Sequence, residues 1–166
     1  LQPDQVTPFS SRKVWWICDE GHSYHMQVAD RTQRHCGCPY CAGVKVLPGF
    51  NDLASHYPDI AAQWHPSKNG SLTPEQVTYG STKHVWWLCP RGHEWKAAIT
   101  ARAYMGTGCP VCANRVVLTG YNDLKTLYPD LAAEWDMQKN APLTPDQIIS
   151  SSGKKVWWRC RLGHSY

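Results

Sequence analysis

Short runs of alternating apolar and polar residues recur along the chain. Lys13–Ile17 reads Lys-Val-Trp-Trp-Ile, and this β-branched and aromatic run predicts a strand. Residues 23–28 alternate in the same way and predict the return strand of a hairpin. Residues 84–88 with 94–99 repeat the pair, and residues 155–159 repeat its first strand. Because neighbouring side chains on a strand point to opposite faces, one tryptophan of each Trp-Trp pair should pack inward, while the other covers something else or stays exposed.

Between the hairpins the pattern becomes helical and rich in turns. Residues 58–64 and 129–135 both begin with proline, which suits the first position of a helix. In each segment an apolar residue and a tryptophan stand four positions apart, on one helix face. We therefore expect Trp64 and Trp135 to be core residues.

Polar residues at the starts of these helices predict caps rather than catalysis. Asn51 and Asn122 are interpreted as N-caps, and residues 73–76 resemble a capping box with proline at the first helical position. The helix dipole and capping account for the nearby carboxylates, which are Asp52, Asp59, Asp123 and Asp130.

The whole pattern repeats with a period of 71 residues, and the repeated residues include a set of metal ligands. Each complete unit contains Cys-x3-His, then 15 residues, then Cys-x2-Cys. Three thiolates and one imidazole are the ligand number of a structural zinc site. We expect two complete Zn²⁺ sites, formed by Cys18, His22, Cys38 and Cys41 and by Cys89, His93, Cys109 and Cys112. Cys160 and His164 begin a third, incomplete site.

Eight cysteines could instead form a disulfide framework. Seven of them, however, occupy repeat-equivalent positions associated with a recurring Gly-His, for which disulfide pairing offers no reason. Cys36 has no counterpart, because Thr107 stands at that position, and we expect that it is not a ligand. Reduced cysteines predict an intracellular, reducing compartment.

The repeat predicts small α+β modules, each needing a metal because a unit of this size has a thin core. The first zinc module is assigned to residues 1–71, the second to residues 72–142, and the start of a truncated third to residues 143–166. The chain is therefore interpreted as part of a longer array, or as the ordered part of one. A knuckle, a hairpin and then Cys-x2-Cys leading into a turn or helix is the order of a treble-clef zinc finger.

The combined motifs resemble one family along essentially the whole chain. They are Val-Trp-Trp-x-Cys-x2-Gly-His, Gly-Cys-Pro-x-Cys, Asn-Asp-Leu, Tyr-Pro-Asp-x-Ala-x2-Trp and Lys-Asn. The chain is similar to the zinc-ribbon, treble-clef domain found in tandem in bacterial, protist and large-virus proteins. The resemblance implies one Cys3His zinc site per repeat and nucleic-acid binding, sometimes beside a nuclease domain. The chain departs from the pattern where His35 stands in place of the glycine at Gly106.

Four protein ligands close each zinc site, whereas a catalytic zinc keeps a position open. We find no other catalytic constellation, and the chain is predicted not to be an enzyme and to take no small-molecule substrate. The histidines outside the ligand set that lack a recurring partner are expected at the surface, namely His25, His35, His56 and His65. No apolar run is long enough to span a membrane.

Formal net charge is +4, and each filled Cys3His site carries −1, so any basic surface must be local. Basic residues recur before each Trp-Trp strand and after the hairpins, where with an outward ring they could contact a phosphate backbone and stack on bases. The candidates are Arg12, Lys13, Arg31, Lys83, Arg102, Lys154 and Lys155. A solvated face that balances acidic groups explains them equally well.

Three functions remain open at this point. The first is a tandem array that binds nucleic acid, RNA or DNA, and we favour it for the recurring basic and aromatic residues. The second is a structural or protein-interaction repeat within a large assembly such as a ribonucleoprotein particle, which the weak net charge favours. The third is the targeting arm of a nuclease, which would need catalytic residues outside these 166.

Overall fold

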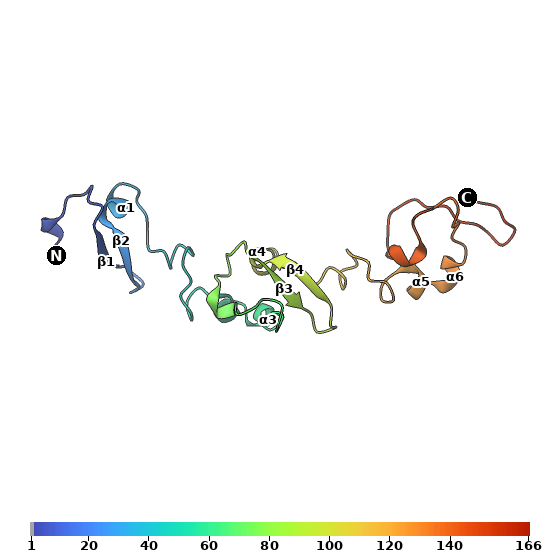
Figure 1. The fold of residues 1–166 in the computed structure, drawn as a ribbon, viewed down its shortest axis with the longest axis horizontal. Helices are drawn as coiled ribbons and strands as arrows, with labels where there is room; N and C mark the ends of the chain where they lie inside the picture. Colours follow the sequence, from blue (N-terminus) through green and yellow to red (C-terminus); the bar gives the residue numbers. More distant parts are fainter. Residues whose placement is uncertain (1) are drawn as a thin grey trace. The chain divides into compact units, whose positions relative to one another are not determined.

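The computed structural model describes residues 2–166 and shows small α+β modules, each with a two-stranded hairpin or its beginning and short helices (Figure 1). It divides into one unit that extends to Leu88 and includes Lys96–Gly106, and a second that comprises Cys89–Trp95 and Thr107–Tyr166. The strands are β1 (Lys13–Ile17), β2 (Ser23–Gln27), β3 (His84–Leu88) and β4 (Glu94–Ala98). The helices are α1 (Val28–Thr32), α2 (Leu53–His56), α3 (Pro58–Ala61), α4 (Ile99–Ala103), α5 (Leu124–Leu127) and α6 (Pro129–Ala132). Single 3-10 turns occupy Pro3–Gln5, Pro74–Gln76 and Pro145–Gln147.

The hairpins have the predicted order. β1 pairs antiparallel with β2, in a register that sets Trp15 opposite His25 and Trp16 opposite Tyr24. β3 pairs with β4. The predicted strand at residues 155–159 forms isolated bridges instead, between Trp158 and Trp135 and between Arg159 and Ser165. Among the described residues, no helix is long and apolar enough to cross a membrane.

The first unit builds its core where α2 and α3 meet β3. Leu53, Trp87 and Ile99 are fully buried. Trp64 stacks edge-on against Trp87, with ring centroids 5.5 Å apart, and its indole donates to the Leu72 carbonyl at 3.0 Å. The linker after one Cys-x2-Cys therefore packs on the hairpin that follows it.

The second unit repeats this core. Leu124, Trp135 and Ile148 form a buried cluster, and Trp135 meets Trp158 edge-on at 5.5 Å. The expectation of a core residue is confirmed for Trp135, which is buried, whereas Trp64 is half-buried against Trp87. The module boundaries expected from the repeat remain a prediction.

The N-caps lie one residue later than the sequence suggested. Asp52, not Asn51, caps α2 by accepting the Ser55 amide at 2.9 Å, and Asp123 likewise accepts the amide of Thr126 at 2.8 Å. Burial raises the pKa of the Asp52 carboxyl, but hydrogen bonds from Ser55 and Gly49 outweigh it and hold the pKa below its ordinary value. The capping box at residues 73–76 is confirmed.

Candidate metal centres

The tip of each hairpin presents a cysteine and a histidine on one side. In the first copy the Cys18 amide donates to the His22 carbonyl at 3.1 Å, and the Gly21 amide donates to the Cys18 carbonyl at 2.8 Å. Gly21 has a φ of +79°, in the left-handed region that side chains disfavour. Gly92 adopts a φ of +81° in the second copy. Glycine at this position therefore allows the turn that brings the thiol and the imidazole together.

The Cys-x2-Cys knuckle forms a second tight turn, in which the Ala42 amide donates to the Cys38 carbonyl at 2.9 Å. The side chain of Asn51 holds this turn in place. Its amide nitrogen donates to the Tyr40 and Lys45 carbonyls at 2.8 Å each, and its oxygen accepts from the Leu47 amide at 2.7 Å.

Asn122 clamps the second knuckle in the same way, through the Val111 and Val116 carbonyls and the Leu118 amide. The interpretation of Asn51 and Asn122 as helix caps was therefore wrong. Both side chains position metal ligands instead. Their recurrence in the repeat was a signal for this role, but the local pattern resembled a cap.

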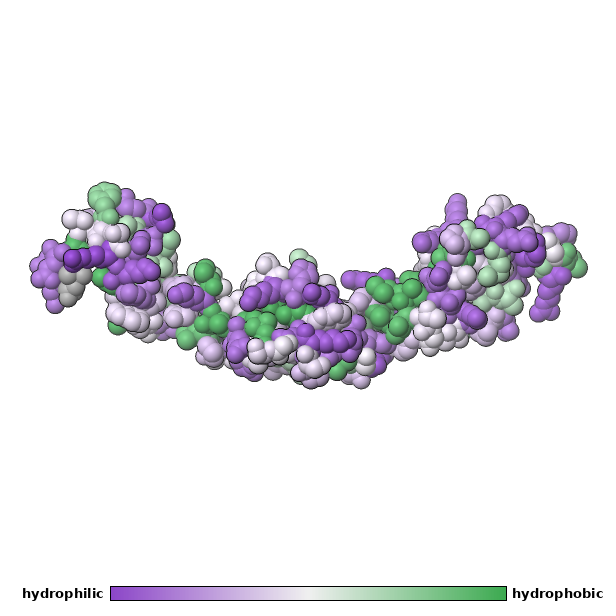
Figure 2. All heavy atoms as spheres, viewed as in Figure 1, coloured by the Kyte–Doolittle hydropathy of each residue, from purple (hydrophilic) through white to green (hydrophobic). Residues whose placement is uncertain are grey.

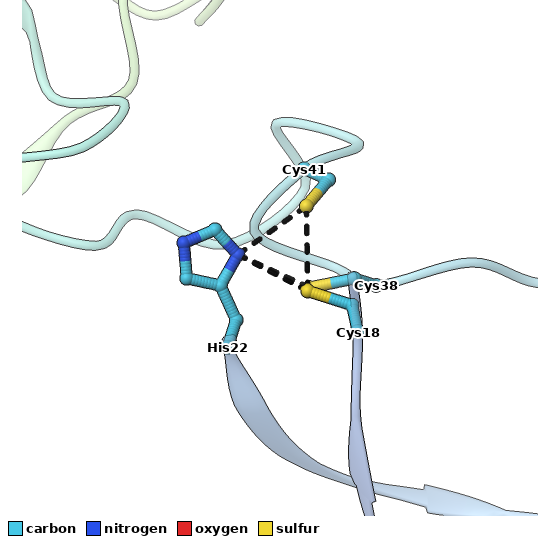
Figure 3. Close-up of side chains that lie close together, drawn as sticks. All are labelled: Cys18, His22, Cys38 and Cys41. Carbon is cyan, nitrogen blue, oxygen red and sulfur yellow. Dashed lines mark hydrogen bonds between the residues drawn. The ribbon is translucent and has the colours of Figure 1, made fainter. Parts of the chain in front are cut away.

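In both copies the four predicted ligands converge. Figure 3 shows three sulfurs and the His22 ring nitrogen meeting in the first copy. The Cys18 and Cys41 sulfurs lie 3.8 Å apart, and His22 Nδ1 lies 3.4, 3.8 and 3.3 Å from the sulfurs of Cys18, Cys38 and Cys41. Each set of four ligand atoms fits within 4.8 Å.

The second site has the same dimensions. Cys89 and Cys112 sulfurs are 3.8 Å apart, and His93 Nδ1 is 3.2 to 3.6 Å from the sulfurs of Cys89, Cys109 and Cys112. A tetrahedral ion with ordinary zinc bond lengths would separate two sulfurs by about 3.8 Å and a sulfur from a nitrogen by about 3.6 Å. Both sets of residues therefore fit a four-coordinate ion and are metal-binding sites of zinc-finger type.

The electrostatics of the ligands also call for a cation. Desolvation, with hydrogen bonds shared with Cys38 and Cys18, raises the pKa of the Cys41 thiol to about 12. The same causes, acting from Cys109 and Cys89, raise the pKa of Cys112 to about 11. Closely spaced thiols resist releasing all their protons, and a bound divalent ion reverses this by stabilising every thiolate.

Aromatic rings cover the imidazoles. Phe50 lies edge-on to His22 with centroids 4.2 Å apart, and its repeat counterpart Tyr121 lies 4.4 Å from His93. The histidines present Nδ1 to the sulfurs, so Nδ1 is the nitrogen placed to bind a metal ion. All eight cysteines are free in this structure, and Cys36 belongs to neither site.

Cys160 and His164 form only the first half of a site. The Cys160 amide donates to the His164 carbonyl at 3.0 Å, and Gly163 has a φ of +86°. This is the same knuckle as at Cys18 and Cys89. Within residues 2–166 no further Cys or His joins the pair.

The second tryptophan of each pair is the inward one. Trp87 is fully buried and donates to the Ala97 carbonyl at 3.1 Å, whereas Trp16 and Trp158 are half-buried. The first tryptophan lies on the other face of the strand, where Trp15 is 71% and Trp157 47% exposed, whereas Trp86 is half-buried. The expected inward and outward faces are therefore confirmed.

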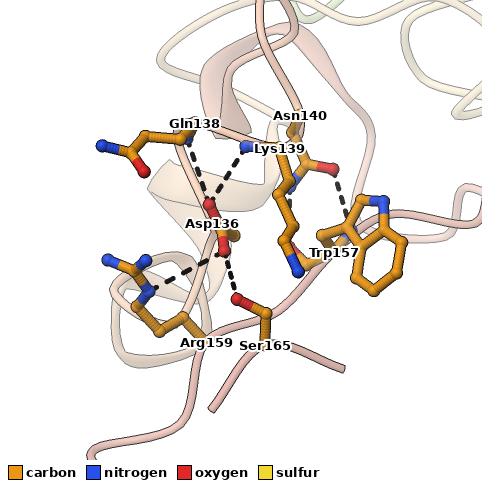
Figure 4. A network of polar contacts seen from close by, with 7 residues as sticks. All are labelled: Asp136, Gln138, Lys139, Asn140, Trp157, Arg159 and Ser165. Atoms are coloured by element: carbon orange, nitrogen blue, oxygen red, sulfur yellow. Dashed lines mark hydrogen bonds and ion pairs between the residues drawn. The ribbon is translucent and has the colours of Figure 1, made fainter. Parts of the chain in front are cut away.

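A lysine from the preceding linker lies over the outward ring, and an asparagine from the same linker binds the backbone of that tryptophan. Lys139 Nζ lies 4.3 Å from the centroid of Trp157, and Lys68 Nζ lies 4.8 Å from that of Trp86. Asn140 accepts the Trp157 amide at 2.8 Å and donates to its carbonyl at 2.7 Å (Figure 4). Both lysines belong to the recurring Lys-Asn motif, whose role was not predicted.

A buried acceptor shapes the turn that carries this lysine. Asp136 accepts the amides of Gln138 and Lys139 at 3.1 Å each and also binds Ser165 and Arg159 (Figure 4). Hydrogen bonds from the Ser165 hydroxyl and the Lys139 amide hold the pKa of the Asp136 carboxyl below its ordinary value.

His65 takes the position of Asp136 one repeat earlier. Its Nδ1 accepts the amides of Ser67 and Lys68 at 3.2 and 3.1 Å, and the residue is buried. The expectation of a surface histidine was therefore wrong for His65. Both copies place a hydrogen-bond acceptor at this position, but one is a histidine and the other an aspartate, so the repeat did not reveal it. His25, His35 and His56 are exposed as expected.

The predicted nucleic-acid contacts have different surroundings. The residues that precede the strands are exposed, namely Arg12, Lys13, Lys83, Lys154 and Lys155. Arg31 lies over the ring of Trp16 at 5.3 Å and donates to the Cys36 carbonyl. Arg102 is buried over the ring of Trp87 and donates to Gln63, so we correct its assignment from contact residue to core residue.

Comparison with known families gives one result. A family model described as a probable treble clef zinc finger domain matches the chain three times, over residues 1–44, 60–115 and 131–166. Among curated proteins, none matches the chain. The three matches each contain one Cys-x3-His knuckle, and the first two also contain a complete ligand set.

Proposed function

Because the chain belongs to the treble-clef zinc-finger family, we propose that it is a non-catalytic array of Zn²⁺-stabilised modules that binds nucleic acid. Three thiolates and one imidazole at tetrahedral spacing favour zinc over harder cations, which prefer oxygen ligands. The four-ligand sites leave no position for substrate. Cys160 and His164 are proposed as half of a third site that needs two further ligands.

The observation that carries the nucleic-acid proposal is the outward tryptophan. Trp15 and Trp157 expose large apolar surfaces to solvent. The side chains of Asn69 and Asn140, from the preceding linkers, accept hydrogen bonds from the Trp86 and Trp157 amides. Aromatic faces of this kind stack on unpaired bases of any sequence. A lysine ammonium beside the ring adds positive charge where a stacked nucleotide would carry its phosphate.

Exposed basic residues precede each outward tryptophan in the sequence. Lys13 and Trp15 alternate with inward residues on β1 and so share its outward face. Lys83 precedes the inward Val85 by two residues, and Lys155 directly precedes the inward Val156. Single-stranded RNA or DNA is therefore the favoured ligand, because a duplex hides the base faces that the rings would contact.

A titration of the purified chain against single- and double-stranded RNA and DNA, at several salt concentrations, tests the proposal. We expect single strands to bind best. Charge reversal at Lys13, Lys83 and Lys155 to Glu should weaken binding at all sequences. The salt slope should flatten by about 0.7 per lost phosphate contact, or about two in total.

The matched control reverses three exposed cations elsewhere, Lys45, Arg115 and Lys125, to Glu. This variant has the same net charge, so it separates local contacts from bulk attraction. Zinc content should stay at two ions per chain in both variants. Absence of binding at low salt, or equal loss in both triple variants, would refute the proposal and favour the protein-interaction alternative.

A further inference from the structure

The linker that precedes the second hairpin covers the outer edge of β3. The His65 amide donates to the Trp86 carbonyl at 3.0 Å, and the Leu88 amide donates to the Gln63 carbonyl at 2.8 Å. At the start of α2, the Leu53 amide donates to the Val77 carbonyl at 2.9 Å. The linker thus pairs with the edge of β3 through an isolated antiparallel bridge between Trp64 and Trp87.

The linker before Trp157 makes the same contacts. The Asp136 amide donates to the Trp157 carbonyl, the Arg159 amide donates to the Glu134 carbonyl, and the Leu124 amide donates to the Ile148 carbonyl. This backbone pairing of the linker with the strand edge is therefore a property of the repeat, since both copies have it although most of the residues involved differ.

On β1 the equivalent edge is open. The Trp15 carbonyl, the Ile17 amide and the Val6 carbonyl correspond to the three covered groups, and within residues 2–166 none of them has a hydrogen-bond partner. Ile17 is 75% exposed, whereas its counterpart Leu88 is half-buried. An unpaired strand edge is a template for pairing with another segment.

An apolar groove of about 570 Å³ runs beside this edge. Its walls include Val6, Pro8, Val14, Trp16 and Val28. In the second copy the corresponding positions are filled, so that Val77, Val85 and Trp87 are buried beneath Leu53 and Trp64. Figure 2 shows that apolar patches interrupt a mostly hydrophilic surface, and Ile17 is among the exposed apolar residues.

We propose that this groove is a docking site for the linker of a further zinc-finger repeat. The occupant carries the pattern shared by residues 51–69 and 122–140, which is Asn-Asp-Leu, then Tyr-Pro-Asp-x-Ala-Ala-x-Trp, then Lys-Asn. Its leucine and tryptophan fill the groove, and its backbone pairs with Val6, Trp15 and Ile17. Its asparagine binds the backbone of Trp15, as Asn69 binds Trp86.

The proposal does not depend on nucleic-acid binding. The groove is lined by Val14 and Trp16 of the inward face of β1 and also by Trp15 and Ile17, and the backbone contacts of a linker along this edge involve no nucleotide. A docked linker would add a lysine beside Trp15, because Lys68 and Lys139 reach the equivalent rings from their linkers.

The test titrates the zinc-loaded 166-residue chain with a synthetic peptide of residues 51–72, observed by NMR and fluorescence anisotropy. The chain's own linkers already cover the other hairpins at high effective concentration, so added peptide should bind only the open edge. We expect saturable 1:1 binding with shifts of the Val6, Trp15 and Ile17 signals. The peptide of residues 122–143 should bind at the same place.

Substitutions on both partners sharpen the result. Trp64→Ala in the peptide should weaken binding at least about tenfold, because a buried aromatic anchor carries much of such an interface. Val6→Asp in the chain should do the same by placing a charge in the groove. Val44→Asp is the matched control, since Val44 is 78% exposed and lies outside the groove.

Each contrary outcome identifies a different error. Absence of saturation at millimolar peptide, or shifts confined to β3, would overturn the proposal. A chain that dimerises without peptide and thereby shifts the same signals would make a second copy the occupant. A single-stranded oligonucleotide that shifts these signals and displaces the peptide would assign the groove to nucleic acid.

Discussion

Replacing the asparagine clamp should weaken one metal site and leave the affinity of the other unchanged. Asn122 is 3% exposed, and its side chain binds the Leu118 amide and the Val111 and Val116 carbonyls at 2.7, 3.2 and 3.0 Å. Asn122→Ala leaves one amide and two carbonyls without this partner. At about 1 kcal/mol for each hydrogen bond, the second module should lose about 3 kcal/mol.

This loss should appear in metal affinity, because ligand binding and module folding are coupled. About 3 kcal/mol corresponds to a roughly 100-fold weaker second site. A comparable effect is typical when groups that orient metal ligands are removed. Asn51→Ala should weaken the first site by the same factor through Tyr40, Lys45 and Leu47.

Competition with a chromophoric chelator measures the affinity, and cysteine alkylation followed by peptide mass mapping identifies the site that opens. In Asn122→Ala, Cys109 and Cys112 should react first, and in Asn51→Ala, Cys38 and Cys41. The two variants serve as controls for each other. Equal reactivity of both sites in either variant, or a change in affinity below about threefold, would refute the clamp.

Three further changes have definite expected outcomes. His35 has a φ of +51° where Gly106 has +60°, so His35→Gly should raise the free energy of unfolding by about 0.5–1 kcal/mol in chemical denaturation; a loss of stability would contradict this. Asp52→Ala removes the α2 cap and should cost about 1–2 kcal/mol in the same assay, whereas Asp59→Ala, which caps nothing, should cost less. His65→Ala should cost about 1–3 kcal/mol by removing a buried acceptor of two backbone amides, and His65→Asp should restore most of it, because Asp136 accepts the equivalent amides in the next copy.

The metal sites could be predicted because their chemistry permits few substitutes. A thiolate or imidazole that binds zinc cannot be exchanged for another side chain without losing the ion, so Cys18 and Cys89 recur unchanged at a fixed distance. The hairpins followed from the same logic, since alternation and a glycine turn leave little choice of structure. The features that could be predicted were therefore those that only one residue type can provide.

Positions where several residue types serve one purpose were predicted poorly. Asn51 and Asp52 are both good N-caps, and only the tertiary structure assigns the cap to Asp52 and the clamp to Asn51. Arg102 resembled a surface cation, yet its guanidinium stacks on Trp87 within the core. The packing of each linker on the following hairpin is likewise invisible locally, because it joins segments that no periodic pattern connects.

The repeat itself separates positions that support the fold from positions that do something else. Buried or strained positions tolerate exchange as long as the conformation or the hydrogen bond survives, as with His65 and Asp136 or with Gly43 and Asn114, which both have positive φ. The outward tryptophan behaves differently. It is identical in all three copies, while His25 and Lys96 differ at the position beside it. Its ring is exposed in Trp15 and Trp157 and half-buried in Trp86. A large apolar side chain kept at the surface is costly to explain by packing alone, which is why we propose recognition at this face.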